Sequence, residues 1–308
     1  MNEIQEPRIG SSDDLVQVCS ERSKLESLAY KLLGTVSDAE DAVQETYLRW
    51  YKLEPTVRQE IVAPIAWQRT TLTRVCFDKL KASKSKREIY VGEWLPEPLP
   101  YNQFWPSISQ SANPADPADR ISTAQTVSMA LMIVLDKMTP AERVSFILHD
   151  VFQYSFDEIS EIVDRTPQAC RQLASSARKQ IDRESRFRCT REEHAQVNEA
   201  FRSAWTTGNI KALVAVLSSA TRAVTDGGGR VSAASEPLYG RKAVIDFFLT
   251  AFDRQSDLVI QQAIVNGEPG LIGRVGEQTV SVIATSILNG KIIDIWVMRN
   301  PEKLTVWH

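Results

Sequence analysis

The stretch SFDEISEIVDRTPQACRQLASSARKQI, Ser155 to Ile181, predicts two helices joined by a tight turn. Ser155 can cap the first helix, with Glu158 three residues later completing a capping box. Thr166 can cap the second helix, in which Pro167 occupies the first position, where proline is favoured. A short helix, a tight turn and a helix rich in Gln, Arg, Ser and Lys are typical of a helix-turn-helix motif that reads DNA.

Helical spacing divides the second helix of this motif into two faces. Ala169, Leu173 and Ala177 fit the buried side. Arg can pair with guanine and Gln with adenine, each contributing about 1–3 kcal/mol of base discrimination. The alternative is a helix face that is only solvated. The residues left on the outward face are Gln168, Arg171, Gln172, Ser175, Arg178 and Lys179.

The chain upstream of this motif also has helical periodicity. Apolar residues recur at helical spacing from Leu15 to Arg49. The segment GTVSDAED interrupts them, because Gly34 can end one helix and Ser37 can cap the next with Glu40. The side of that next helix expected to face inward consists of Ala42, Val43, Thr46 and Tyr47. The side expected to face outward contains Asp38, Asp41, Gln44, Glu45 and Arg49.

A third helix is predicted after Pro64, in IAWQRTTLTRVCFDKLKAS. Its surface mixes aromatic, Thr and basic side chains, a combination that can follow a phosphate backbone and receive unstacked bases. Trp67 fits a buried position as well as it fits a base-stacking position. The other candidates for burial are Leu72, Val75, Cys76 and Leu80.

Charge is segregated along this chain of 308 residues and net charge −3. Residues 1–60 hold twelve acids and seven bases, residues 69–87 hold seven bases and one acid, and residues 165–191 hold eight bases and two acids. Two basic blocks in an acidic chain suggest two contacts with a polyanion. A solvated helix face would explain either block alone.

Composition excludes several other classes of protein. No apolar run approaches the roughly 20 residues that cross a bilayer, and MNEIQEPRIG has no signal-peptide pattern. The four cysteines and three histidines are too scattered for a metal centre. We therefore expect a cytoplasmic protein with reduced thiols, no membrane contact, no metal and no cofactor.

The two remaining parts of the chain differ from these helices. Residues 89–120 contain six prolines, which predict a linker, but Trp94, Leu95, Tyr101, Phe104 and Trp105 indicate that it packs against something. From residue 191, helical segments near 192–207 and 240–254 frame strand-like text: DLVIQQAIV, GLIGRV, TVSVIATSIL and KIIDIWVMR. This pattern predicts a separate α+β domain.

Together these segments carry a family resemblance. LAYKLLGTVSDAEDAVQETYLRWYK resembles region 2 of bacterial extracytoplasmic-function (ECF) sigma factors, and LDKMTPAERVSFILHDVFQYSFDEISEIVDRTPQACRQLASSARKQI resembles their region 4. With WLPEP, DGGGR and NPEKL, the rest resembles the subgroup with a fused SnoaL-like domain. The resemblance implies a multidomain fold: all-α region 2 (12–88), a linker (89–120), all-α region 4 with its helix-turn-helix (121–190), and an α+β, cone-shaped SnoaL/ketosteroid-isomerase-like (NTF2-like) domain (191–308).

The resemblance also implies partners: core RNA polymerase and promoter DNA. The positions that match the polymerase-docking surface are Asp38, Asp41, Gln44 and Glu45. Those that match the −10 DNA surface are Trp67, Arg69, Thr70, Thr73, Arg74, Lys79 and Lys81. Those that match the −35 surface are Thr166, Gln168, Arg171, Gln172, Ser175, Arg178 and Lys179. This chemistry is binding rather than catalysis, so we expect no enzyme.

The glycine run TDGGGRV, residues 225–231, is not a phosphate loop, because it lacks the Lys-Ser/Thr and the longer glycine spacing of that motif. We expect a flat surface that packs against region 2 or the linker and regulates the sigma regions in cis. Asp226 and Arg230 would fix its register, although a plain turn also accommodates glycine. The predicted interdomain set is Trp94, Leu95, Pro96, Asp226, Gly227, Gly228, Gly229 and Arg230.

Enzymatic chemistry in the last domain would need an acid or histidine tuned toward neutral pH. Asp226 and Asp294 are candidates, but Asp226 adjoins glycines that suggest an exposed turn, and His194 and His308 lie at the ends of the domain. A small-molecule ligand in its cavity is a further possibility. The alternative function is a ligand-responsive helix-turn-helix regulator that never joins polymerase.

Overall fold

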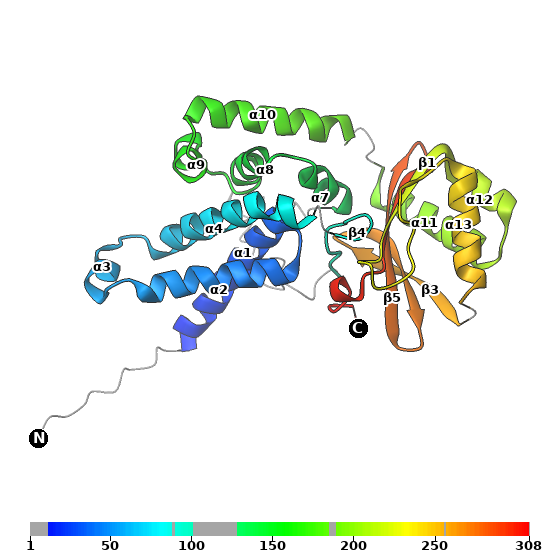
Figure 1. Cartoon of the computed structure of the whole chain (residues 1–308), viewed down its shortest axis with the longest axis horizontal. Coiled ribbons are helices and arrows are strands. Elements are labelled where there is room, and N and C mark those ends of the chain that lie inside the picture. The colour runs from blue at the N-terminus through cyan, green and yellow to red at the C-terminus, as the bar shows by residue number, and fades with distance from the viewer. Residues whose placement is uncertain (1–11, 88–89, 101–127, 185–188, 256, 308) are drawn as a thin grey trace, which may run out of the picture.

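The computed structural model describes residues 12–87, 90–100, 128–184, 189–255 and 257–307. Helices come first along the chain, and a sheet with three more helices follows (Figure 1). The first helical group consists of α1 (Ser12–Leu33), α2 (Val36–Lys52), α3 (Pro55–Glu60) and α4 (Pro64–Arg87). The second helical group consists of α7 (Met129–Asp136), α8 (Pro140–Phe146), the π-helical turn η1 (Ile147–Val151), α9 (Phe156–Val163) and α10 (Pro167–Glu184).

Local sequence sets most helix starts. Ser155 and Glu158 form the expected capping box of α9, and the Thr166 side chain accepts a hydrogen bond from the Ala169 N–H at the start of α10. The expected cap of α2 was wrong by two positions. Thr35, not Ser37, is the N-cap, and its hydroxyl oxygen accepts from the Asp38 N–H, so Ser37 lies inside the first turn.

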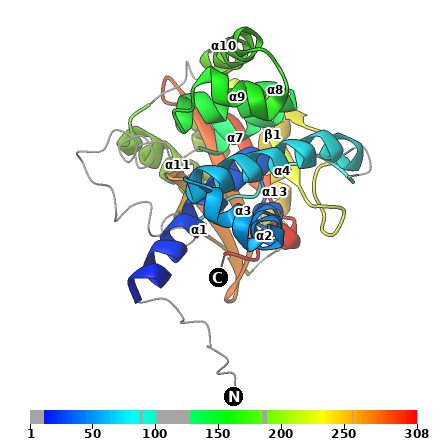
Figure 2. The same cartoon turned by 90° about the vertical axis from the view of Figure 1, so that its left-hand side faces the viewer.

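The two helical groups share one apolar core. Leu28 and Leu32 of α1 and Leu72 of α4 lie in the same cluster as Leu148 and Ile159 of the second group. All five are essentially inaccessible to solvent. Both views place α8 and α9 directly against α4 (Figures 1 and 2). The two groups therefore form one packed body in this structure.

The C-terminal domain is built on one six-stranded sheet in the order β2-β1-β6-β5-β4-β3. Only the β1–β6 pair is parallel; the other pairs are antiparallel. The strands are β1 (Leu217–Asp226), β2 (Leu238–Tyr239), β3 (Leu258–Val265), β4 (Glu268–Val275), β5 (Gln278–Leu288) and β6 (Lys291–Met298). The helices are α11 (Arg191–Thr206), α12 (Ile210–Val216) and α13 (Arg241–Asp253), and a 3-10 turn, η2 (Pro301–Lys303), follows the sheet.

Both faces of the sheet are covered, by different parts of the chain. On one face, Ile283 and Ile295 pack against Phe201 and Phe248 of the domain's own helices. Because side chains alternate along a strand, Val282 and Trp296 point to the other face. That face packs against the linker, α7 and the C-terminal residues. The last domain thus docks onto the helical body through its sheet.

Helix α7 (MALMIVLD) is the bridge between these two bodies. It is apolar around its whole circumference, which is expected only for a helix buried on all sides. Met132 and Leu135 lie in the helical core, whereas Met129 and Ile133 lie in the cluster on the sheet. Release of the C-terminal domain would therefore expose apolar surface on α7.

The structure adds short elements that the sequence analysis did not expect, among them α3, η1, α12 and β2. None of the helices in the described ranges combines the length and the hydropathy needed to cross a membrane.

Candidate functional site

The acidic face of α2 is open to solvent. Asp38, Asp41 and Gln44 are exposed and Glu45 is half-buried. Glu45 accepts a hydrogen bond from Arg49 one turn later, and Asp41 lies 3.7 Å from Lys79 of α4. Contacts between exposed charges contribute little to stability, so these residues remain available to a partner.

The candidate −10 residues on α4 do not share one environment. Trp67 is half-buried and its ring centroid lies 5.2 Å from that of Trp50, so it is already part of an aromatic pair. Arg69 and Thr70 are half-buried, and Arg74 and Lys81 are exposed. Lys81 pairs with Asp78 at 2.9 Å.

Thr73 was expected to contact −10 DNA, and its position in the structure corrects that expectation. It is fully buried, and its hydroxyl donates to the Arg69 carbonyl within the same helix. It therefore cannot contact DNA in the arrangement that this structure shows.

The buried face of α10 differs from the expected one at two of its three positions. The residues buried against α8 and α9 are Cys170, Ala174 and Ala177, while Ala169 and Leu173 are only half-buried. Among the expected DNA contacts, Thr166, Gln168, Arg171, Gln172 and Lys179 are exposed and Ser175 is half-buried.

Arg178 differs from the rest of the α10 set. Its guanidinium donates to both carboxylate oxygens of Asp150, at 2.7 and 3.0 Å. A bidentate pair of this kind fixes the side chain. Arg178 therefore holds α10 against η1, and its expected role in base reading is not supported by the geometry.

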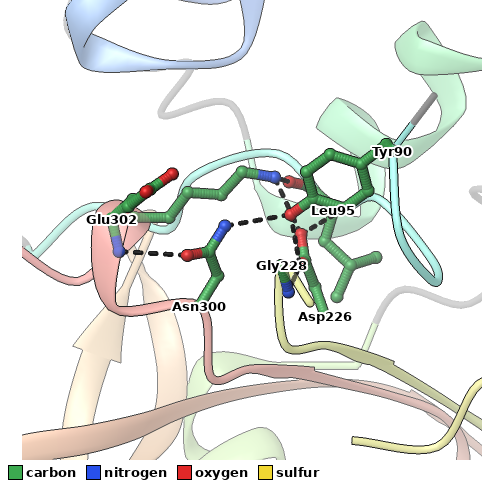
Figure 3. Close-up of polar contacts among 7 residues, drawn as sticks. Tyr90, Leu95, Asp226, Gly228, Asn300 and Glu302 are labelled. Atoms are coloured by element: carbon green, nitrogen blue, oxygen red, sulfur yellow. Dashed lines mark hydrogen bonds and ion pairs between the residues drawn. The ribbon is translucent and has the colours of Figure 1, made fainter. Parts of the chain in front are cut away.

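The glycine-rich end of β1 meets the linker through Asp226. This carboxylate is completely buried, contrary to the exposed turn expected from its neighbours. It accepts hydrogen bonds from the Leu95 N–H at 2.9 Å and the Tyr90 hydroxyl at 2.6 Å, and it pairs with Lys303 Nζ at 2.7 Å (Figure 3). We call Tyr90, Leu95, Asp226, Asn300 and Lys303 the linker clasp.

The other members of the linker clasp surround this carboxylate. Lys303 Nζ also donates to the Leu95 carbonyl and lies 4.2 Å from the Trp94 ring centroid. The Asn300 amide donates to the Tyr90 hydroxyl (Figure 3). Burial and the neighbouring Asp226 raise the pKa of Tyr90, so its phenol stays protonated and can donate. A buried charge paired in this way resists being pulled apart.

At each of the three positions after Asp226, a different neighbouring atom leaves no space for a side chain larger than that of glycine. A Cβ on Gly227 would lie 2.5 Å from the Val231 carbonyl oxygen, and one on Gly228 would lie 2.4 Å from the Asn300 amide. A Cβ on Gly229 would lie 2.9 Å from Val91 in the linker. Gly228 and Gly229 also have φ of 61° and 66°, which favours glycine.

Arg230 was expected to take part in the interdomain contact, and the structure corrects that expectation as well. Its guanidinium does not reach the linker; it pairs with Glu302 at 2.7 Å, and both side chains are largely exposed. The acid of DGGGR enters the linker clasp, whereas the base stays inside its own domain. In the linker, the Leu95 N–H donates to Asp226, the Trp94 ring lies next to Lys303, and Pro96 is buried.

A second contact joins all three parts of the chain at Asn266, in the turn between β3 and β4. Its backbone N–H donates to the Leu99 carbonyl, and its side-chain oxygen accepts from the Leu99 N–H. Its amide nitrogen donates to the Tyr30 hydroxyl of α1 at 2.9 Å. The C-terminal domain therefore contacts the first helical group directly as well as through the linker.

Glu97 ties the same linker to the start of α2. Its carboxylate accepts from the Val36 N–H, one of the free amides at the helix N-terminus, and its own N–H donates to the Gly34 carbonyl. Burial, the largest cause, raises the pKa of Glu97 to about 7. The WLPEP motif thus supplies a helix cap to α2 from outside that helix.

Sequence reasoning missed Lys303, Asn300 and Asn266 as site residues. Two of them lie in NPEKL, which was noted as a family signature without an assigned role. Asn266 opens the NG turn between two strands, and its left-handed φ of 48° is ordinary for such a turn. The linker residues Tyr101, Phe104 and Trp105 lie outside the described residues.

The candidate acids and bases of the C-terminal domain are engaged in ion pairs or hydrogen bonds within the protein. Asp226 pairs with Lys303, and Asp294 pairs with Arg222 at 2.8 Å. His194 is buried, and its Nε2 lies 2.9 Å from the Thr285 hydroxyl. Because that hydroxyl donates to Asn198, it accepts from a protonated Nε2, and burial lowers the pKa of His194 to about 4. Within the described residues, no His, Cys, Asp and Glu cluster could hold a metal.

Comparisons with known proteins agree with this architecture. The models of Sigma-70 region 2 and Sigma-70, region 4 match residues 18–86 and 128–181. The ECF RNA polymerase sigma factor SigJ of Mycobacterium tuberculosis is 32% identical, over 92% of this chain and 91% of that protein. The probable ECF RNA polymerase sigma factor SigI of the same species is 30% identical over 92% of each.

A solved structure extends the likeness to the whole fold. The crystal structure of the Mycobacterium tuberculosis extracytoplasmic function sigma factor SigJ superposes with a TM-score of 0.71 at 31% identity, covering 95% of this chain and 98% of that one. The likeness therefore includes the C-terminal α+β domain. A regulator that never joins polymerase is not favoured by these matches. The chain belongs to the ECF sigma factors, with regions 2 and 4 followed by an α+β domain consistent with the SnoaL-like type.

Proposed function

We propose that this sigma factor binds core RNA polymerase through α2, meets −10 DNA with α4 and reads −35 DNA with α10, and that its C-terminal domain restrains these activities in cis. Support for the first part comes from the exposed acidic face of α2 and the exposed polar face of α10. Sigma factors are in general not enzymes, and we propose that the last domain acts by contact rather than by turnover.

The observation that carries the restraint is the contact between α4 and the second helical group. The Arg74 guanidinium donates to the Glu161 carbonyl at the end of α9, at 3.2 Å. Promoter elements centred near −10 and −35 are about 25 base pairs apart, roughly 85 Å along a duplex that rises 3.4 Å per pair. A body in which α4 touches α9 cannot span that distance, so promoter binding requires the two groups to separate.

The C-terminal domain favours the closed arrangement because it holds pieces of both groups. The linker clasp and Asn266 hold the linker and α1, and the sheet holds α7. Opening would separate the buried Asp226–Lys303 ion pair from the linker and expose α7. A partner such as polymerase shifts this equilibrium only through its greater affinity for the open arrangement.

The test is in vitro transcription by core polymerase with the full-length chain on a promoter library. Deletion of the last domain is a poor first experiment, because it would expose Met129 and Ile133. Lys303→Met keeps the length of the side chain and removes the charge from the clasp. Lys242→Met is the matched control, since Lys242 forms an exposed pair with Asp246 inside the same helix, α13.

We expect Lys303→Met to raise promoter-directed transcription and affinity for core polymerase, and Lys242→Met to leave both unchanged. Lower transcription by Lys303→Met, with the protein still folded, would mean that the clasp assists initiation. If neither the full-length chain nor the variant bound polymerase or started transcription at specific promoters, the proposed function itself would be wrong.

A further inference from the structure

The C-terminal domain contains a cavity that the proposed function does not use. It has a volume of about 570 Å³ and lies between α13 and the strands β5 and β6, partly open to solvent. Trp205, Phe247 and Phe248 supply aromatic walls, and Ile283 and Val297 supply aliphatic ones. Small-molecule sites usually enclose about 300–1,000 Å³ and are mostly apolar with a few fixed polar groups.

Arg299, the residue directly after β6, lines this cavity and is half-buried. Its guanidinium donates to the carbonyl oxygen of Ser232, a neutral partner. None of the described carboxylates forms an ion pair with it, and Asp246, the acid in the lining, pairs with Lys242 instead. Burial lowers the pKa of Arg299, and no acid opposes that effect. Burying a cation without a counter-ion costs free energy, so an anion in the cavity would be stabilised.

We propose that this cavity binds an apolar carboxylic acid whose ring or chain lies against Trp205 and Phe247 and whose carboxylate pairs with Arg299. The planar guanidinium can hold both carboxylate oxygens at once, which a neutral ligand cannot exploit. Arg254, exposed at the rim of the same cavity, supplies a second positive charge.

The site is connected to the linker clasp by short covalent and hydrogen-bonded steps. The Arg299 N–H donates to the Asp226 carbonyl at 2.7 Å, and the next residue, Asn300, donates to Tyr90. Ser232 lies in the loop between β1 and β2, and the same loop holds Gly229, which lies against Val91. A bound carboxylate that draws Arg299 away from Ser232 would remove a hydrogen bond from this loop, which contacts the linker at Val91. This regulatory consequence rests on the proposed function; the binding does not.

The experiment measures binding to the full-length chain by calorimetry, with 1-naphthoate and the neutral 1-naphthamide as probes, and without polymerase or DNA. We expect naphthoate to bind at least about tenfold more tightly than naphthamide, as for a hydrogen bond to a charged group. In Arg299→Met the two affinities should become equal. Arg241→Met is the matched control: Arg241 also donates to a carbonyl, that of Val214, but does not line the cavity.

A second variant guards against misfolding of the first. Ala251→Leu keeps Arg299 and fills the cavity, so it should weaken both probes together. Equal binding of acid and amide by the wild type, an acid preference that survives Arg299→Met, or no binding of naphthoate at millimolar concentration would each overturn the site. Transcription is read separately, so failure of binding leaves the sigma-factor proposal standing, and failure of transcription leaves the binding site standing.

Discussion

The carboxylate of Asp226, buried at the end of β1, accepts a hydrogen bond from the backbone N–H of Leu95, 131 residues earlier in the chain. The same carboxylate pairs with Lys303 at 2.7 Å. One side chain thus joins the linker between the two sigma regions to the last residues of the C-terminal domain. Its energetics give the first prediction.

Asp226→Ala should destabilise the folded chain by about 3–5 kcal/mol, because it leaves the buried Lys303 cation without its partner. Arg230→Ala in the same motif should cost about 0–1 kcal/mol, because its pair with Glu302 is exposed. Urea unfolding followed by tryptophan fluorescence measures both. Equal losses for the two variants would contradict the assignment of Asp226 to the linker clasp.

Gly229→Ala should loosen the linker, because its new Cβ would lie 2.9 Å from Val91. We expect faster hydrogen exchange at residues 90–95. Gly276→Ala is the matched control: it has a similar φ of 58° but no neighbouring atom within 4 Å. It should carry the backbone strain of about 1 kcal/mol and leave the linker unchanged. Val91→Gly in the Gly229→Ala background should restore the wild-type exchange, since it removes the obstructing atoms.

The contact between the linker and region 2 should weaken as pH rises, because the buried Glu97 carboxyl loses its proton. Burial raises its pKa to about 7, above the ordinary value, although Lys303 opposes the shift and Glu40 and Asp38 add to it. The folded state therefore takes up a proton at a pH where the unfolded chain does not, and this stabilising contribution is lost as pH rises toward and through 7. The free energy of unfolding of the wild type minus that of Glu97→Gln should fall between pH 5 and 8. A flat difference would exclude the effect.

The contribution of His194 to the free energy of unfolding should depend on pH in the opposite direction to that of Glu97. Burial lowers the pKa of His194 to about 4, so the folded state holds a neutral imidazole while the unfolded state protonates near 6.5. Its contribution is present above pH 6.5 and lost as pH falls from 6.5 to 4. The hydrogen-exchange protection factors in α11 and β5, where His194 and Thr285 lie, should therefore fall toward pH 5 more than those in α4. His194→Gln should remove this difference.

Variants in the two sigma regions should distinguish residues that contact DNA from residues that stabilise the fold. Arg171→Ala and Gln168→Ala should each weaken binding of a −35 duplex by about 1–3 kcal/mol and relax sequence preference, because both side chains are exposed on α10. Arg178→Ala should instead lower stability, since it frees Asp150. Thr73→Val should leave −10 binding unchanged. Fluorescence anisotropy and thermal unfolding distinguish these outcomes.

The sequence by itself predicted the elements whose causes are local. The Ser155–Glu158 capping box, the helix-turn-helix and strands β3 to β6 depend on neighbouring residues, and the structure has them where the pattern placed them. The acidic motif on α2 and the sigma-family resemblance followed from short contiguous stretches. Packing of DGGGR against either region 2 or the WLPEP linker was also expected, because glycine runs permit close approach.

Only the tertiary structure decided which side chains meet. Asp226 finds Lys303 because β1 lies parallel to β6, which brings the residues after both strands to the same end of the sheet. Arg230, four residues later, has turned away toward Glu302. Thr73 is buried because of how α4 packs, and α7 is apolar on every side because two separate bodies cover it. Spacing along the chain carries the period of a helix or strand, but pairings across 77 or 131 residues depend on strand order and docking, which no local pattern encodes.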